Sequence, residues 1–217
     1  MTLAIFDLDN TLIGGDSDNL WGQFLCENGL VESDDFALRN EQFYQDYQAG
    51  NLDVDAYLKF ALQPLKNQSP ETLAGWHRDF MKLKIEPIIL PRALELIEQH
   101  RAWGHKLLII TATNEFITRP IADRLNIEDM LACEAEIVGG QYTGRPIGVP
   151  SYHSGKVTRL KTWLAQHGGD MEGAFFYSDS HNDLPLLEIV DNPIAVDPDE
   201  KLRDYALDKS WPIISLR

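Results

Sequence analysis

The stretch LAIFDLDNT, residues 3–11, joins a short apolar run to two acidic residues two positions apart. The run from Leu3 to Phe6 is apolar at every position, as in a parallel strand that is covered on both faces. Because side chains alternate along an extended chain, we expect Asp7 and Asp9 to point to the same side. Two carboxylates about 4 Å apart repel by roughly 4 kcal/mol at an effective dielectric near 20. A cation or a shared proton is therefore expected between them.

Further apolar runs alternate with helical patterns along the rest of the chain. The runs span Leu107 to Ile110, Ala174 to Tyr177 and Ile194 to Val196. The helical patterns span residues 91–103, 114–125, 155–167, 182–190 and 199–207. This alternation predicts an α/β fold, in which a parallel sheet is flanked by helices. Pro120 interrupts the second helical pattern and predicts either a kink or the start of a new helix.

Residues 14–87 consist of further helical patterns, which predict a helical module inserted after the first strand. Domain boundaries follow at 1–13 and 88–217 for the sheet-containing core and at 14–87 for the insertion. The insertion carries aromatic residues at helical spacing, which we expect to form its own core: Trp21, Phe24, Phe43, Tyr44, Tyr47, Trp76 and Phe80. Residues 132–143 contain Gly139-Gly140 between two extended pieces, which predicts a hairpin.

Composition excludes several classes of function. The 217 residues carry a formal net charge of -15, and basic patches for nucleic acid or an anionic membrane surface are missing. The only cysteines, Cys26 and Cys133, are far apart, and two reduced thiols are favoured over a disulfide. Neither a signal peptide nor a membrane-spanning stretch is indicated, so we expect a soluble cytoplasmic protein.

Polar residues follow three of the predicted strands at the point where each strand ends. Asp7 and Asp9 follow the first run, the segment Thr111–Thr113 follows the second, and Asp179 and Asp183 follow the third. Ligands of open α/β sheets bind beyond the carboxyl ends of the strands, so these segments should converge on one crevice. Mg²⁺, which prefers oxygen ligands and is often shared with a phosphate, fits this cluster best.

Lys156 and the surrounding motifs carry a family resemblance. FDLDNT, LLIITAT, the lysine of SGKV and YSDSHNDLPLL are similar, in this order, to the four motifs of the haloacid dehalogenase superfamily. The insertion resembles the C1-type cap of that superfamily, and together with the chain's tail it resembles the phosphoserine phosphatase-like subfamily. The resemblance covers nearly the whole chain. It implies a Rossmann-like sheet with an inserted helical cap.

The resemblance also implies a phosphoryl-transfer role for each motif. Asp7 would attack phosphorus and form an aspartyl-phosphate, and Asp9 would act as general acid and then as general base. Thr111 and the Ala112 amide would bind phosphate oxygens, and Lys156 would neutralise charge on the phosphate and on Asp7.

For the metal, the resemblance implies that Mg²⁺ binds the Asp7 carboxylate, the Asp9 backbone carbonyl and Asp179. Asp183 would support the ion directly or through water. The presence of Asp9 separates the chain from the dehalogenases of the superfamily, which lack this second acid and need no metal.

Two motifs depart from the phosphoserine phosphatase pattern. The second reads TAT in place of Ser-Gly-Gly, and the fourth reads SDSHND in place of Gly-Asp-Gly-x-Asn-Asp. The catalytic groups are kept, but phosphoserine is less favoured as the substrate. The chain is more similar to a sister group that includes histidinol-phosphate phosphatases.

The predicted enzyme is thus a Mg²⁺-dependent phosphomonoesterase for a small amino-alcohol or amino-acid phosphate, with histidinol phosphate ahead of phosphoserine. Asp16 and Glu115 are candidates for contacting the substrate. Ser17 or Asp18 could instead simply cap the following helix, and Glu115 could serve as a first-turn acid. Surface salt bridges are the favoured use of Arg39 and Arg119.

Two alternatives remain at this level. A sugar phosphomutase would use the same aspartyl-phosphate, and a non-catalytic regulatory protein would usually have lost Asp7 or Asp9. A calcium loop over DLDNTLIGGDSD is disfavoured because its sixth position is Leu12 and its twelfth is Asp18.

Overall fold

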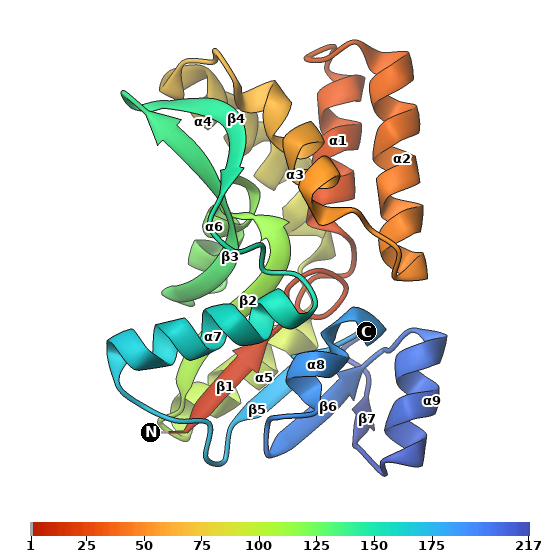
Figure 1. The fold of residues 1–217 in the computed structure, drawn as a ribbon, viewed down its shortest axis with the longest axis vertical. Coiled ribbons are helices and arrows are strands. Elements are labelled where there is room, and N and C mark those ends of the chain that lie inside the picture. The colour runs from red at the N-terminus through yellow and green to blue at the C-terminus, as the bar shows by residue number, and fades with distance from the viewer. Residues whose placement is uncertain (1) are drawn as a thin grey trace.

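The computed structural model describes residues 2–217, except for the side chain of Ser33. Over these residues the strands are β1 (Leu3–Phe6), β2 (Lys106–Asn114), β3 (Asp129–Val138), β4 (Gln141–Ile147), β5 (Phe175–Ser178), β6 (Asn192–Val196) and β7 (Ile213–Ile214). They form one sheet in the order β4-β3-β2-β1-β5-β6-β7. Every neighbouring pair is parallel except β3 and β4, which form an antiparallel hairpin. The predicted α/β fold and the predicted hairpin are confirmed (Figure 1).

Helices cover both faces of the sheet, and the alternation of β1 supplies the reason. Ala4 and Phe6 pack in one cluster with α5 (Pro91–Ala102) and α6 (Glu115–Arg124). Leu3 and Ile5 pack in a second cluster on the other face. That cluster includes residues of α7 (Ser154–His167), α8 (Leu184–Leu187) and α9 (Glu200–Asp208). Since β1 is buried on both faces, its fully apolar sequence is explained.

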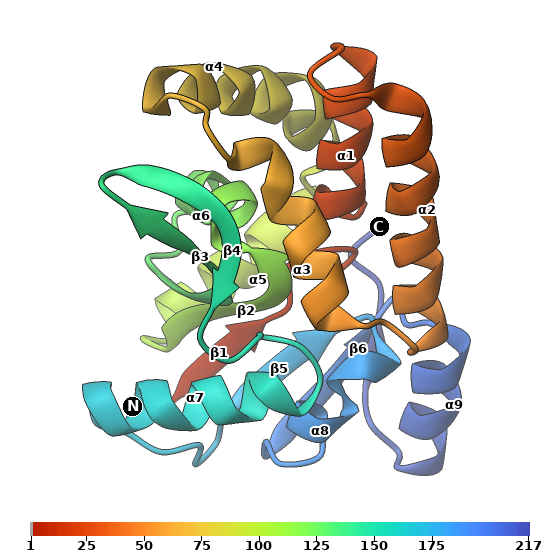
Figure 2. The same ribbon diagram turned by 45° about the horizontal axis from the view of Figure 1, so that its top comes forward.

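Between β1 and α5 the chain forms a set of helices that lie at the carboxyl end of the sheet (Figures 1 and 2). It contains α1 (Ser17–Glu27), α2 (Ser33–Ala49), α3 (Val54–Leu62), α4 (Pro70–Phe80) and the short turns η1 (Gln63–Leu65), η2 (Met81–Ile85) and η3 (Glu86–Ile88). The chain enters and leaves this segment side by side. Ile13 pairs with Ile89, and the N–H of Gly14 donates to the carbonyl oxygen of Ile88 over 2.7 Å.

Helix starts are set by capping side chains. Asp16 has an extended backbone and accepts a hydrogen bond from the N–H of Asn19, so α1 begins at Ser17. The cap is therefore Asp16, and the expectation that Ser17 or Asp18 caps this helix is wrong. Pro120 lies inside α6, which is one helix, so no new helix starts at the proline.

Two other local expectations are corrected. β1 ends at Phe6, so the alternation of an extended strand does not apply to Asp7 and Asp9. Trp21 and Phe80 pack in the same cluster as Phe6, so the inserted helices share the core of the sheet. Among the described residues, none of the helices has the length and apolarity required to cross a membrane.

Candidate active site

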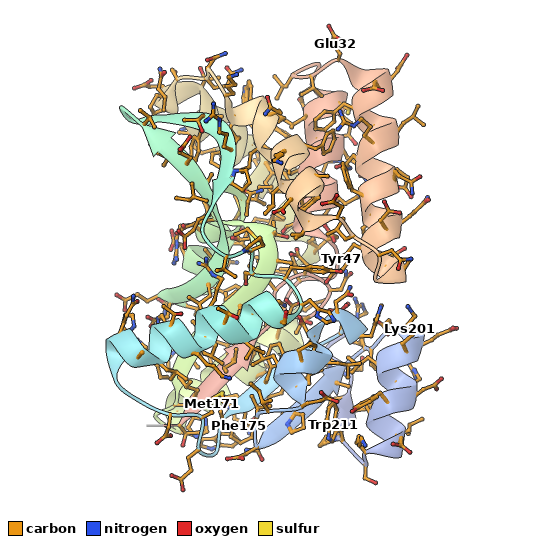
Figure 3. The ribbon with its side chains drawn as sticks, viewed as in Figure 1. Glu32, Tyr47, Met171, Phe175, Lys201 and Trp211 are labelled. Carbon is orange, nitrogen blue, oxygen red and sulfur yellow. The ribbon has the colours of Figure 1, made fainter. Side chains whose placement is uncertain are left out.

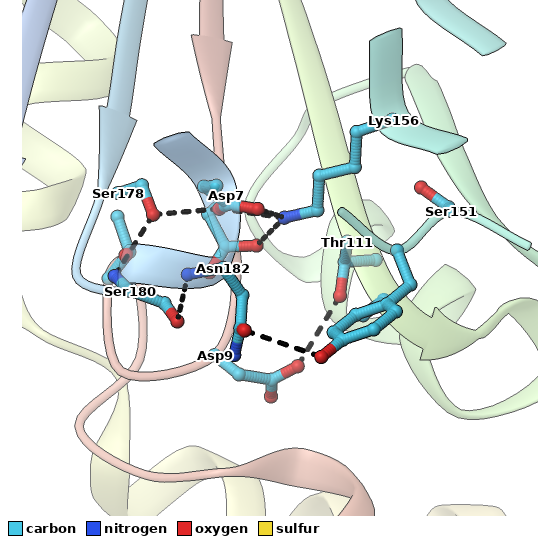
Figure 4. Close-up of polar contacts among 12 residues, drawn as sticks. Asp7, Asp9, Thr111, Ser151, Lys156, Ser178, Ser180 and Asn182 are labelled. Atoms are coloured by element: carbon cyan, nitrogen blue, oxygen red, sulfur yellow. Dashed lines mark hydrogen bonds and ion pairs between the residues drawn. The ribbon is translucent and has the colours of Figure 1, made fainter. Parts of the chain in front are cut away.

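Lys156 lies in the first turn of α7 and forms the buried centre of the site. Its Nζ lies 2.7 Å from Asp7 Oδ1 and 2.7 Å from Asp183 Oδ1 (Figure 4). The side chains of all three residues are buried. Because two carboxylates share one ammonium away from water, the lysine is locked in its charged form.

The pKa values of this group reflect burial and charge together. Burial raises the pKa of Asp7 to about 7, opposed by Lys156 and reinforced by Asp183 and Asp9. Burial alone would lower the pKa of Lys156, but the carboxylates of Asp183 and Asp7 outweigh it and hold the pKa above its ordinary value. Asp7 is thus a carboxylate that gains from any further cation placed beside it.

Asp183 faces Lys156 and the end of β5. Its Oδ2 accepts from the Ser178 hydroxyl over 2.7 Å, and its side chain is 1% exposed. The structure therefore brings Asp183 to the lysine, where it orients the ammonium that contacts Asp7. Ser178 carried no signal in the sequence beyond its place at the end of a strand.

Asp9 is held in a separate set of hydrogen bonds. The N–H of Ser17 donates to its Oδ1 over 2.6 Å, and the Thr113 hydroxyl donates to its Oδ2 over 2.8 Å. The Thr111 hydroxyl reaches the same Oδ2 at 3.4 Å. The carboxylate is thereby aimed toward the Thr111–Thr113 segment, with β2 and the start of α1 fixing its position.

Asp179 completes the acidic group at the end of β5. Its Oδ1 accepts from the Thr11 hydroxyl over 3.3 Å, and its own N–H donates to that hydroxyl oxygen over 3.1 Å. Burial, followed by the charges of Asp7 and Asp183, raises its pKa well above the ordinary value. A carboxyl group in this position favours either a proton or a nearby cation.

The donor chemistry at this point fits Mg²⁺. Within residues 2–217, no three His, Cys, Asp or Glu side chains are spaced to bind one ion. Magnesium needs fewer, because one or two carboxylates, a carbonyl and waters or phosphate oxygens complete its octahedron. Asp7 and Asp179 could supply the carboxylates, and burial raises the pKa of both, so a cation beside them would favour their charged forms.

A cavity opens beside Asp7 and encloses about 540 Å³ of empty space, including its mouth. Its walls contain polar groups from the motifs and from α1, and aromatic and aliphatic groups from α2, α3 and the intervening loop. The lining residues are Asp7, Asp9, Asp16, Asp18, Asn19, Asn40, Phe43, Tyr44, Tyr47, Leu52, Val54, Tyr57, Thr111, Ala112 and Thr113.

The sequence does not predict the aromatic lining. The helical spacing of Tyr44 and Tyr47 predicts that they pack in a helical core, but they line the cavity, together with Tyr57. Tyr47 lies between the inserted helices and the sheet-containing half (Figure 3). Helical spacing gives the same pattern for a residue that packs in a core and for one that faces a cavity, so the sequence held no signal to separate them.

Glu115 is not brought to this cavity. Its side chain is half exposed, pairs with Arg119 at 3.6 Å and lines a different surface pocket. Arg39 places its guanidinium over the Phe60 ring, 4.7 Å from the centroid. Asp16 does line the cavity, and its carboxylate caps α1. Burial, then the charges of Asp9 and Asp18, raise the pKa of Asp16 well above its ordinary value.

The fold and the site define an α/β enzyme with a buried carboxylate–lysine centre beneath an acidic cavity. Residues 4–188 match the haloacid dehalogenase-like hydrolase family. The chain belongs to this family, and within it the chain is a phosphatase.

Relatives of this chain include curated and structurally determined proteins. A histidinol-phosphatase from Neisseria meningitidis serogroup C (strain 8013) is 47% identical over 219 residues, covering 99% of each chain. A phosphoserine phosphatase from Mycobacterium tuberculosis (strain ATCC 25618 / H37Rv) is 30% identical over 217 residues, covering 99% of this chain and 70% of the other.

Two solved structures are similar in fold. A protein of unknown function from Bordetella pertussis Tohama I matches with a TM-score of 0.93 and 39% identity, covering 100% of both chains. A substrate-bound phosphoserine phosphatase matches with a TM-score of 0.72 and 16% identity, covering 100% of this chain and 93% of the other. The second match establishes similarity of fold alone.

Proposed function

We propose that the chain is a Mg²⁺-dependent phosphomonoesterase that acts on a small amino-alcohol phosphate, with histidinol phosphate as the favoured substrate. The observation that carries the proposal is the composition of the cavity. Asp7 and the phosphate-binding segment stand on its wall together with Asp16 and Asp18. None of the described residues that line it is Lys, Arg or His. The similarity to the Neisseria histidinol-phosphatase supports the same substrate.

The proposed reaction uses two acids in sequence. The Asp7 carboxylate attacks phosphorus while the bond from phosphorus to the leaving oxygen breaks, and Asp9 gives its proton to that oxygen. Water then attacks the aspartyl-phosphate, Asp9 takes a proton from it, and Asp7 is released with inorganic phosphate. Thr111 and the Ala112 N–H bind the phosphate oxygens, and Lys156 balances their charge.

Asp7, Asp179 and the backbone carbonyl of Asp9 would hold the magnesium ion. When bound, Mg²⁺ neutralises negative charge between the carboxylates and the phosphate. Asp183 accepts hydrogen bonds from Lys156 and Ser178 and so holds the lysine ammonium in position.

The cavity favours an amino alcohol over phosphoserine. The acids Asp16 and Asp18 suit a cationic leaving group, whereas a substrate carboxylate would find no basic side chain among the described lining residues. Phosphoserine is the second candidate, since a 30% identical relative is a phosphoserine phosphatase. A sugar phosphomutase is the third candidate, and turnover without release of free phosphate would reveal it.

We infer that residues 14–87 form a cap over the site. The isolated bridge between Ile13 and Ile89 supports these boundaries, because it brings the two ends of the segment together at one point, where a hinge can form. α1, α2 and α3 supply most of the cavity wall, so closure of the cap would exclude bulk water during phosphoryl transfer.

The test is phosphate release from a panel of esters, with Mg²⁺ and then with EDTA. Histidinol phosphate, phosphoserine, phosphoethanolamine, glycerol phosphate and several sugar phosphates form the panel, beside Asp7→Asn and the exposed control Asp55→Asn. We expect metal-dependent release that is highest for histidinol phosphate, lost in Asp7→Asn and kept in Asp55→Asn. Absence of release from every ester would refute the proposed activity.

A further inference from the structure

The first turn of α1 contains three buried polar atoms without a partner, on Ser17, Asp18 and Asn19, and the last two of these residues line the cavity. Asp18 and Asn19 are each 9% exposed, and both line the cavity. Neither Asp18 Oδ1 nor Asn19 Nδ2 has a hydrogen-bond partner in the described structure. Buried polar groups in native proteins are almost always paired, so an acceptor and a donor that lack partners on the wall of one cavity indicate that a ligand supplies the missing bonds.

Asp16 has no atom among these buried, unpaired groups. One of its carboxylate oxygens accepts the N–H of Asn19 over 2.8 Å, which caps α1. Burial raises the pKa of Asp18 to about 7, opposed by the Tyr57 hydroxyl, and its Oδ1 has no partner. Of the two acids Asp16 and Asp18, Asp18 is therefore the one with a buried oxygen that lacks a hydrogen bond.

The wall near these atoms is apolar and aromatic. Phe43, Leu52 and Val54 line the same cavity as Tyr57. Phe43 and Tyr57 meet edge to face, with ring centroids 5.8 Å apart. Such a surface favours a flat ring over a flexible polar chain, because burying the ring removes apolar area from water and gains aromatic contacts.

We propose that Asp18 and Asn19 bind the imidazole ring of an imidazole-bearing amino-alcohol phosphate, and so determine specificity for it. A neutral imidazole has one N–H donor and one bare nitrogen acceptor. Asp18 Oδ1 accepts from the N–H, and Asn19 Nδ2 donates to the bare nitrogen. An ammonium group only donates, and it would leave Asn19 Nδ2 unpaired. The inference rests on the proposed phosphatase function and adds the residues that recognise the ring.

The test compares two esters that share the amino-alcohol phosphate and a flat ring. Histidinol phosphate has the ring nitrogens and phenylalaninol phosphate lacks them. In Asp18→Ala, the ratio of kcat/KM for histidinol phosphate to that for phenylalaninol phosphate should fall by roughly 10- to 100-fold, because the acceptor is removed and the ring N–H loses its partner. The matched control Asp55→Ala, at an exposed site on α3, should keep the wild-type ratio.

The outcomes separate this inference from the proposed function. An unchanged ratio in Asp18→Ala, with both esters still hydrolysed, would overturn the role of Asp18 and leave the phosphatase intact. Hydrolysis of neither ester by the wild-type enzyme would overturn both. Should Asp18→Ala fail to fold, calorimetry on the wild-type enzyme decides. Histidinol should bind at least tenfold more tightly than phenylalaninol, and equal affinities would refute the inference.

Discussion

Lys201 on α9 donates from its ammonium to the carbonyl oxygen of Ala49, the last residue of α2, over 2.9 Å. The contact joins the inserted helices to the sheet-containing half at a helix C-terminus, where the carbonyls carry partial negative charge. Beside it, the amide of Asn182 donates to the carbonyl oxygen of Tyr47 over 2.9 Å. Since Tyr47 lines the cavity, these two bonds hold part of its wall in place.

Replacing Lys201 with methionine should loosen this end of α2. We expect faster hydrogen exchange of the α2 amides and a roughly threefold to tenfold fall in kcat/KM, because one hydrogen bond to a charged donor is removed. Lys209→Met, just beyond the same helix, is the control. Equal exchange rates for α2 in both variants would refute a role for Lys201 in docking the helix.

Gly50 lies at the same contact and has φ of 79°, which favours glycine. A Cβ atom there would lie 2.7 Å from His181 Nε2. Gly50→Ala should therefore lower both the melting temperature and phosphate release. Gly29→Ala is the matched control, since Gly29 has φ of 63° and open space around its Cβ position. The backbone strain of roughly 1 to 2 kcal/mol is common to both. If the two variants melt at the same temperature, the contact with His181 is not tight.

Lys156→Met should abolish most activity. The change leaves Asp7 and Asp183 buried without their shared counter-charge, and it removes a positive charge from the phosphate site. We expect phosphate release to fall by at least about 100-fold, together with a lower melting temperature. Lys161→Met, exposed on the same helix, should match the wild type in both assays. Activity above one tenth of wild type in Lys156→Met would contradict the proposed role.

Thr113→Val tests the orientation of Asp9. The substitution keeps the volume but removes the hydroxyl that donates to Asp9 Oδ2 over 2.8 Å. Because the N–H of Ser17 still holds the other oxygen, we expect a moderate effect of about tenfold in kcat with little change in KM. Thr113→Ser should restore the rate. A valine variant as fast as the wild type would show that this hydrogen bond does not position the acid.

His100 predicts a dependence of stability on pH. The side chain is fully buried and forms one hydrogen bond with the Tyr177 hydroxyl and one with the His105 ring, each over 2.8 Å. Burial, followed by the charge of His105, lowers the pKa of His100 to about 4. Between pH 6.5 and 4 the unfolded chain binds a proton at this histidine that the folded protein does not. Its contribution, at most about 3 kcal/mol, is thus complete above pH 6.5 and lost as the pH falls toward 4.

The check is thermal melting from pH 7 to pH 4.5. The melting temperature of His100→Gln should fall less over this interval than that of the wild type, because the titrating ring is absent. His167→Gln, at the exposed end of α7, should keep the wild-type dependence. Identical slopes for His100→Gln and the wild type would assign the acid sensitivity to other groups.

Some elements of this fold could be predicted from a single segment of sequence, and others could not. Leu3–Phe6 is β1 without any change of boundary, because a strand buried on both faces is apolar throughout. The apolar run predicts that β2 ends at Ile110, but the strand continues to Asn114, which pairs with Cys133 of β3 beyond an irregularity in the register. β7 is only two residues long and left no detectable pattern.

In the site, the motif residues lie together as their positions at strand ends predicted. The contacts of Thr113 and Ser178 could not be predicted, because a hydroxyl has no sequence pattern that states what it binds. The unpaired oxygen of Asp18 could not be predicted either. The surroundings of this carboxyl group include Tyr57, which lies on a different helix and comes close only in the folded chain.

The central position of β1 also determines the order in which the chain can fold. Ile5 pairs with Leu108 on one side and with Phe176 on the other, so the first strand to be synthesised obtains its partners much later. Such long-range pairing is slow, because the loop must close before any contact rewards it. The inserted helices join segments that are close in the sequence, so we expect them to form early. By bringing Ile13 next to Ile89, they would shorten the effective loop and deliver β1 to β2. We therefore expect the helices that line the cavity in the finished enzyme to act first as a template for assembly of the sheet.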